Sequence, residues 1–277
     1  MKRYIRSAVV NIKDESEETK WELARNPNLR PETLREIADS LSERSPWGAY
    51  VAVIENPNTP VDVLENLMRL YGGDPQVSMT IACCPNVTSE LLKYIYDHSL
   101  GHRGILSCVA GNPKTPEYIL KKLSQNSYSY IRAKCADNPS TPGREKLQGK
   151  LLQSFEVNVR ADLARVTSEY TVLSKLARDP SNKVREMVTA NPNTPSDILA
   201  ISAKDADPMV RISIPTHPNT TPDINRFLSD DINSGVRQRL AWSRKTPIDV
   251  LEKLAEDTDD EVRVHAQESL DEYRSEH

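Results

Sequence analysis

Residues 184–205 read VREMVTANPNTPSDILAISAKD, and variants of this stretch recur along the 277-residue chain. The repeated phrase has the form A-x-N-P-x-T-P-x-x-x-L. Self-similarity at a period of this length is typical of a solenoid, in which each unit packs only on its neighbours. The Asn-Pro position of the phrase recurs at intervals of 25 to 30 residues and is degenerate in the sixth and ninth copies. Its nine positions are 26–27, 56–57, 84–85, 112–113, 138–139, 166–167, 191–192, 217–218 and 243–244.

The same stretch predicts two helices in each repeat. Val184 and Val188 are at helical spacing and give the first helix one apolar side. Pro192 ends that helix, because proline disfavours helical geometry in the residue before it. Thr194 then suits an N-cap and Pro195 the first position of a second helix. A helical hairpin of this size cannot bury its apolar face alone, so the repeats must stack.

A second regularity is a Val-Arg or Ile-Arg pair in most of the first helices, with an aspartate close by. Such a pattern predicts planar, bidentate Arg–carboxylate pairs at the turns between repeats. A row of arginines that faces a ligand is the alternative. The recurrence of the acid with the arginine favours pairing, and the expected partners are Asp179 before Arg185, Asp207 before Arg211 and Asp259 before Arg263.

The order of residues in 184–205, and in 236–257 apart from a lost Asn-Pro, resembles the repeat of the leucine-rich repeat variant (LRV) proteins. The resemblance covers residues 20–270. It implies an all-α, right-handed superhelical solenoid, here of about eight or nine repeats, in which α-helices alternate with 3-10 or short helices. The Val-Arg segment would be the shorter element. HEAT repeats are the alternative, but their units of about 40 residues are too long for this period.

The cysteines argue against a cofactor. One branch of the LRV family carries an N-terminal iron–sulfur domain with clustered cysteines, whereas the first cysteine here is Cys83, inside the repeats. No C-x-x-C spacing occurs, so we expect free, buried thiols in a reducing compartment and no bound cofactor. The four cysteines are Cys83, Cys84, Cys108 and Cys135.

The N-terminus has basic residues but no apolar run of the length that a secretory signal needs, and no stretch reaches the ~18 apolar residues of a membrane helix. We therefore expect a cytoplasmic protein with no membrane contact. Its expected organisation is an N-terminal extension over 1–19, a single-domain solenoid over 20–270 and a polar tail over 271–277.

No established catalytic motif is present in the sequence. His98 and His102 are four residues apart, as two ligands on one helix would be, but the Ser-Leu-Gly between them reads as a turn. The sequence therefore predicts a protein without catalytic, cofactor-binding or metal-binding residues, and so not an enzyme.

The charge distribution is uneven. Residues 103–185 contain 15 Lys and Arg against 7 Asp and Glu, whereas 186–277 contain 10 against 18. Tyr128 and Tyr130 lie within the basic region, where they could stack on bases. A mixed, solvated surface is the simpler interpretation. As a candidate binding surface we take the two tyrosines with Lys121, Lys122, Lys134, Arg144, Lys146, Lys150, Arg165, Lys175 and Lys183.

Two other segments interrupt the repeat. Residues 45–50 and 70–75 are expected to lengthen the first two loops between repeats, and loops of this kind often carry binding residues. Trp47 and Tyr50 are interface anchors if they are exposed. Taken together, the sequence predicts a scaffold that binds a protein partner, with sequence-independent binding of nucleic acid by the basic region 103–185 as the alternative.

Overall fold

The computed structural model describes residues 12, 15–41, 45 and 47–276. These residues form nineteen α-helices and contain no β-strand. The remaining residues of the expected N-terminal extension, 1–11 and 13–14, lie outside the described part of the chain. The chain divides into two compact units, the first made of residues 1–125 and 140–142 and the second of residues 126–139 and 143–277.

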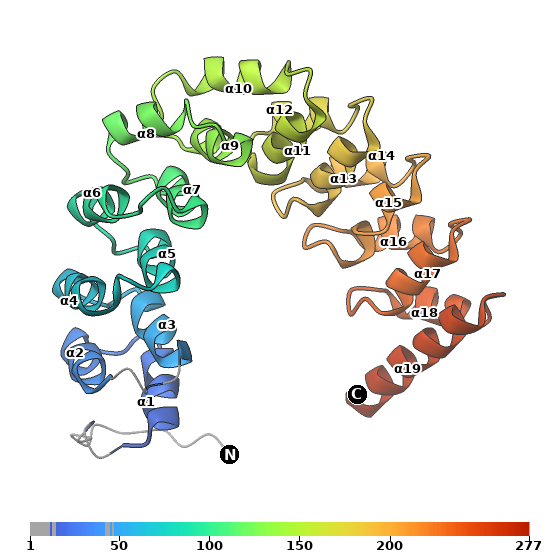
Figure 1. The fold of residues 1–277 in the computed structure, drawn as a ribbon. Helices are drawn as coiled ribbons and strands as arrows, with labels where there is room; N and C mark the ends of the chain where they lie inside the picture. The colour runs from blue at the N-terminus through green and yellow to red at the C-terminus, as the bar shows by residue number, and fades with distance from the viewer. Residues whose placement is uncertain (1–11, 13–14, 42–44, 46, 277) are drawn as a thin grey trace. The chain divides into compact units, whose positions relative to one another are not determined.

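The first unit consists of four helix pairs in two layers. Figure 1 shows α2, α4 and α6 stacked on one side and α1, α3, α5 and α7 on the other. The first helices of the pairs are α1 (Glu17–Ala24), α3 (Trp47–Glu55), α5 (Pro75–Cys83) and α7 (Arg103–Gly111). The second helices are α2 (Pro31–Ser40), α4 (Val61–Tyr71), α6 (Ser89–Asp97) and α8 (Glu117–Leu123).

The second unit continues the pattern and ends with a longer helix. Its first helices are α9 (Ser129–Asp137), α11 (Val157–Val166), α13 (Asn182–Ala190), α15 (Pro208–Arg211) with the 3-10 turn η2 (Ile214–Thr216), α17 (Ser234–Ala241) and α19 (Asp260–Glu276). Its second helices are α10 (Arg144–Leu152), α12 (Tyr170–Leu176), α14 (Ser196–Ser202), α16 (Pro222–Leu228) and α18 (Ile248–Leu254). Neighbouring first helices, such as α11 and α13, pack against each other.

In the described part of the chain, all nine copies of the repeated phrase fall at the turn between the two helices of a pair. The prediction of an all-α solenoid built from helix pairs is therefore confirmed. Each repeat adds a few apolar side chains to a narrow core: in α13 and α14, Val184, Val188, Ile198 and Leu199 are fully buried. Burying each such side chain contributes about 1.5–3 kcal/mol.

The helix lengths differ from the expected alternation. The helix that contains the Val-Arg pair is the longer of the two in some repeats, with nine residues in α13 against seven in α14, but α15, which contains Val210 and Arg211, has four residues against seven in α16. A 3-10 turn replaces the end of a first helix in one described repeat, at η2. Pro215 lies in this turn; it has no N–H to donate and crowds the carbonyl four residues earlier, which splits the helix after Arg211.

In several repeats a buried asparagine joins the turn to the preceding repeat, as at Asn56, Asn112 and Asn191. The Asn191 side chain donates to the carbonyls of Ala164 and Thr167, both at 2.8 Å, and accepts the backbone N–H of Asn193. His217 replaces the asparagine one repeat later: its Nε2 donates to the carbonyl of Asn191 and its Nδ1 accepts the N–H of Asn219. The phrase thus recurs because its polar residue bridges adjacent repeats.

The threonine of the phrase has a different role from the one expected. The N-cap residue of α14 is Pro195 and not Thr194. The Thr194 hydroxyl instead donates back to the carbonyl of Val188, at the end of the preceding helix. Threonine caps occur where a threonine stands at the position of the second proline of the phrase, as at Thr88, which accepts the N–H of Leu91.

Candidate binding surfaces

The arginines of the Val-Arg pairs form a ladder along the second unit. Arg185 donates two hydrogen bonds to Asp205, at 2.6 and 2.9 Å, and a third to the backbone carbonyl of Asp179. Each bidentate pair joins the arginine of one first helix to the aspartate about 20 residues later: Arg160–Asp179, Arg185–Asp205, Arg211–Asp231 and Arg237–Asp257.

Bidentate pairing was predicted, but the expected partners are wrong. Asp179 pairs with Arg160 rather than with Arg185, and Asp207 caps α15 instead of pairing with Arg211. The reason is geometric, since the aspartate of a turn lies beside the helix of the preceding repeat. The hydrogen bonds from Arg237 lower the pKa of Asp257 from its usual value, against the opposing effect of burial. Arginines engaged in this way are not a row of free ligand-binding groups.

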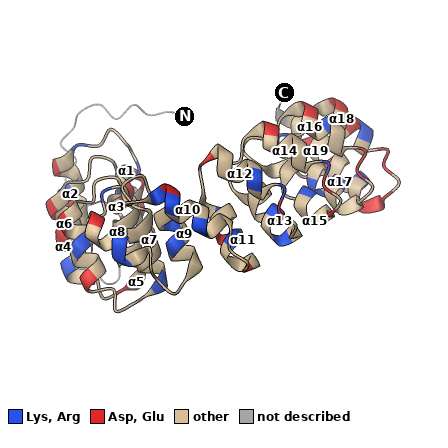
Figure 2. Cartoon of the chain, turned by 90° about the horizontal axis from the view of Figure 1, so that it is seen from above, with Lys and Arg blue, Asp and Glu red and all other residues tan. Residues whose placement is uncertain are grey.

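The basic residues of the candidate surface lie on both helix layers. In the second unit, Lys134, Arg165 and Lys183 belong to the first helices α9, α11 and α13. Arg144, Lys146, Lys150 and Lys175 belong to the second helices α10 and α12. Blue segments mark Lys and Arg in both layers, α9 and α10 among them (Figure 2). Lys121 and Lys122 are exposed on α8, in the first unit.

Several of these side chains have partners. Arg144 forms an ion pair with Glu169 at 2.5 Å, and Lys183 donates to the side chain of Asn158. Lys134 lies over the ring of Tyr130, 5.7 Å from its centroid, and Arg165 contacts the sulfur of Met187. The remaining three in the second unit are exposed and form no ion pair with any described residue: Lys146, Lys150 and Lys175.

The two interface anchors expected near residue 50 differ in exposure. Trp47 is 40% exposed, but Tyr50 is only 6% exposed, because residues 47–55 form the helix α3 instead of a lengthened loop. The second segment that interrupts the repeat, residues 70–75, is not all loop either, because its first two residues extend α4 as far as Tyr71. Tyr128 is exposed and Tyr130 is half-buried at the start of α9.

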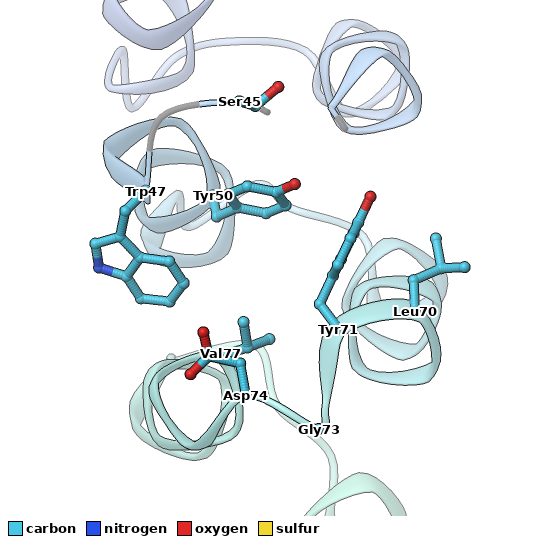
Figure 3. A pocket seen from close by; sticks show the side chains of 8 residues that line it. All are labelled: Ser45, Trp47, Tyr50, Leu70, Tyr71, Gly73, Asp74 and Val77. Atoms are coloured by element: carbon cyan, nitrogen blue, oxygen red, sulfur yellow. The ribbon is translucent and has the colours of Figure 1, made fainter. Parts of the chain in front are cut away.

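Trp47 and Tyr50 border a hollow of about 360 Å³ between α3, α4 and α5. Figure 3 shows Trp47 on one side, Tyr71 on the other, Tyr50 between them, and Val77 with Asp74 opposite. The Tyr50 and Tyr71 rings meet edge to face, with centroids 5.0 Å apart and planes at 73°. Trp47 stacks at 6.2 Å from Tyr50. The sequence drew attention to this region, but Tyr71 and Asp74 were not among the candidates.

Two further hollows lie between successive second helices, one in each unit. A hollow of about 320 Å³ separates α4 from α6, and one of about 410 Å³ separates α14 from α16. Exposed Tyr94 and Phe227 occupy the same repeat position on α6 and α16, and acidic Glu90 and Asp223 share another. Sequence reasoning missed these grooves, although an aromatic residue on the polar side of a short helix was a visible signal.

The described residues contain no group of three or more His, Cys, Asp or Glu placed to hold a metal ion. His98 donates to the carbonyl of Tyr94, and His102 caps α7 by accepting the N–H of Ile105, so each has a structural partner. None of the described helices has the length and apolar character needed to cross a membrane. None of the four cysteines, all of which are described, forms a disulfide bond; Cys84 and Cys135 are buried as expected, whereas Cys108 is partly buried and Cys83 is exposed.

No protein-family model and no curated protein matches the chain. Among solved structures, a leucine-rich repeat variant with a novel repetitive structural motif is similar over 83% of this chain and 87% of its own, with 21% identity and a TM-score of 0.38. A designed armadillo repeat protein in complex with the peptide (KR)4 matches over 92% and 90%, with 14% identity and a TM-score of 0.17. The first of these carries the repeat type that residues 184–205 resemble.

Proposed function

We propose that this protein is a non-catalytic scaffold that binds a protein partner in the grooves between successive second helices. The observation that carries the proposal is that the two grooves share one design. Each has an apolar floor, an exposed aromatic side chain on one wall and a carboxylate at a fixed repeat position. Exposed aromatic side chains beside an apolar hollow are typical of interface hot spots.

The groove between α4 and α6 fits one side chain of a partner. Met68 and Leu91 form its floor and are largely buried, whereas Tyr94 remains exposed. In the groove between α14 and α16, Ala203 and Ile224 form the floor, and Lys204 lies 5.9 Å from the ring centroid of Phe227. An extended segment that inserts apolar side chains between second helices would bury these surfaces.

The scaffold supports this use because polar side chains join its repeats. Turn asparagines bond to the preceding repeat in both units, and in the second unit the ladder arginines add bonds to the next repeat, which helps to hold the groove walls in place. A pre-organised surface loses less entropy on binding.

Selection from a peptide library displayed on phage tests the proposal. We expect peptides that bind the wild-type chain and lose binding to Tyr94→Glu or Phe227→Glu, since a charge cannot enter an apolar contact without a cost. Tyr118→Glu is a matched control, because Tyr118 is exposed on α8 but lines neither groove. Peptides whose binding is unaffected by either groove substitution would contradict the proposal.

Nucleic-acid binding remains the second candidate, on a narrower basis than region 103–185. Lys146, Lys150 and Lys175 lie on the consecutive second helices α10 and α12 and are exposed without ion pairs to described residues. Phosphate contacts of this kind weaken steeply with salt. Anisotropy with labelled random DNA and RNA across a salt series tests it: binding should be lost in Lys146→Glu/Lys150→Glu, and no binding at low salt would exclude it.

A further inference from the structure

The hollow between α3, α4 and α5 has a chemistry that the peptide grooves do not share. Its walls are three aromatic rings, those of Trp47, Tyr50 and Tyr71, and the side chain of Val77. The one charged group among its lining residues is the carboxylate of Asp74. Aromatic ring faces carry partial negative charge and attract cations that lie within about 6 Å of the ring centroid.

The rings are arranged as a corner. Because the planes of Tyr50 and Tyr71 are inclined at 73°, a group in the hollow can contact two aromatic surfaces at once. Trp47 borders the opposite side, and its ring is inclined by 26° to that of Tyr50 (Figure 3). A volume of about 360 Å³ is at the lower end of the range for small-molecule sites.

Asp74 adds a fixed negative charge at the edge of this corner. It is the N-cap of α5, and one of its oxygens accepts the N–H of Gln76 at 2.8 Å. This bond holds the side chain in place. The second oxygen has no hydrogen-bond partner among the described residues and is available to a cation.

The hollow suits a methylated ammonium better than a primary one. A primary ammonium has three N–H donors and is strongly hydrated, so it requires several acceptors when it leaves water. In Figure 3 the hydroxyl groups of Ser45, Tyr50 and Tyr71 point away from the centre of the hollow, which leaves one oxygen of Asp74 as the side-chain acceptor near it among the lining residues. We infer that this hollow binds a quaternary trimethylammonium group. Such a group is carried by choline-type molecules and by trimethyllysine.

The site shares no lining residue with the groove between α4 and α6, so the inference is independent of the proposed function. Calorimetric titration of the whole chain with choline chloride and with the N-acetyl methylamide of trimethyllysine tests it and distinguishes the two sources. The neutral isostere 3,3-dimethylbutan-1-ol and the unmethylated lysine derivative are the ligand controls. We expect a trimethylammonium compound to bind about tenfold more tightly than either control.

Two variants locate the binding. Trp47→Leu should abolish it, whereas Trp242→Leu, which removes another exposed tryptophan outside the hollow, should leave it unchanged. Asp74→Asn preserves a good N-cap while it removes the charge, and should weaken binding severalfold. Circular dichroism confirms that each variant is folded.

Three results would overturn the inference. One is the absence of binding by both ammonium compounds at concentrations of about 10 mM, where even a weak site is occupied. Another is equal affinity for choline and its neutral isostere, which would show an apolar pocket without cation recognition. The third is an equal loss of affinity in folded Trp47→Leu and Trp242→Leu, which would place the ligand elsewhere.

Discussion

Removing one arginine of the buried ladder should destabilise the protein far more than removing an exposed arginine with a similar partner. Arg211 donates to both oxygens of Asp231 at 2.6 Å and to the carbonyl of Asp205 at 2.6 Å. The side chains of this pair are 8% and 4% exposed. Arg211→Met would leave a buried carboxylate without its counter-charge, and breaking such a pair costs about 3–5 kcal/mol.

The exposed pair of Arg226 and Asp249 provides the control. It is also formed between consecutive repeats, with bonds of 2.8 and 3.5 Å, but its side chains are 50% and 59% exposed. Solvent screens this pair, so Arg226→Met should destabilise the protein far less than Arg211→Met. Urea unfolding followed by circular dichroism gives the difference, provided that the slope m is unchanged among the variants.

A double variant separates the loss of the attraction between Arg211 and Asp231 from the cost of leaving the Asp231 carboxylate buried without a partner. Asp231 also accepts the N–H of Asn233, and an asparagine at 231 retains an acceptor for it. Arg211→Met/Asp231→Asn should therefore recover about 1–2 kcal/mol relative to Arg211→Met alone. The reasoning would be refuted if Arg211→Met cost no more than Arg226→Met, or if the double variant were the least stable of the set.

Three more outcomes follow from individual contacts. Burial is the largest effect on His217 and lowers its pKa, so the unfolded state binds a proton first and the unfolding free energy falls as the pH drops below about 6.5. His217→Asn should remove this pH dependence of the unfolding free energy, as measured by urea unfolding between about pH 7 and 5. Thr194→Val should cost about 1 kcal/mol in unfolding free energy because a buried hydrogen bond is lost, whereas Thr171→Val at an exposed position should cost less than about 0.5. Burial raises the pKa of Cys135 to about 12, so iodoacetamide at pH 8 should modify exposed Cys83 first and Cys135 only on unfolding, as read by mass spectrometry.

The helix pairs were predictable because local chemistry determines them. The first proline of the phrase ends a helix, as Pro192 does after α13. The apolar spacing of the second helix likewise predicts which residues are buried, and Leu199 is one of them. The same argument placed all nine turns. The right-handed superhelix, the single-domain organisation of residues 20–270 and the cytoplasmic location remain predictions.

The partners across repeats were not predictable, because sequence distance does not measure them. Asp207 is four residues from Arg211 along the chain, yet Asp231, 20 residues away, is its partner. The pairing depends on how one repeat is set against the next, which the spacing of apolar residues leaves open. The residues of the candidate basic surface lie on both helix layers for a similar reason, since a run of sequence alternates between the two layers, as Lys134 and Lys150 show; their role in binding remains a prediction.

The repeats themselves indicate where function is free to vary. Along the second unit the ladder arginine bonds to the next repeat, and the polar residue of the turn bonds to the previous repeat whether it is Asn191 or His217. In the second helices from α6 to α18, the residue just before the last buried residue has no partner that recurs in every repeat, although Lys253 pairs with Asp230 and Ser229, and its chemistry changes from repeat to repeat. It is Tyr94, Lys122, Lys150, Lys175, Ile201, Phe227 and Lys253 in successive helices from α6 to α18. A position that is exposed, chemically varied and without a recurring partner is where a scaffold can encode the sequence of a bound segment, and the two grooves lie beside its two aromatic members, Tyr94 and Phe227.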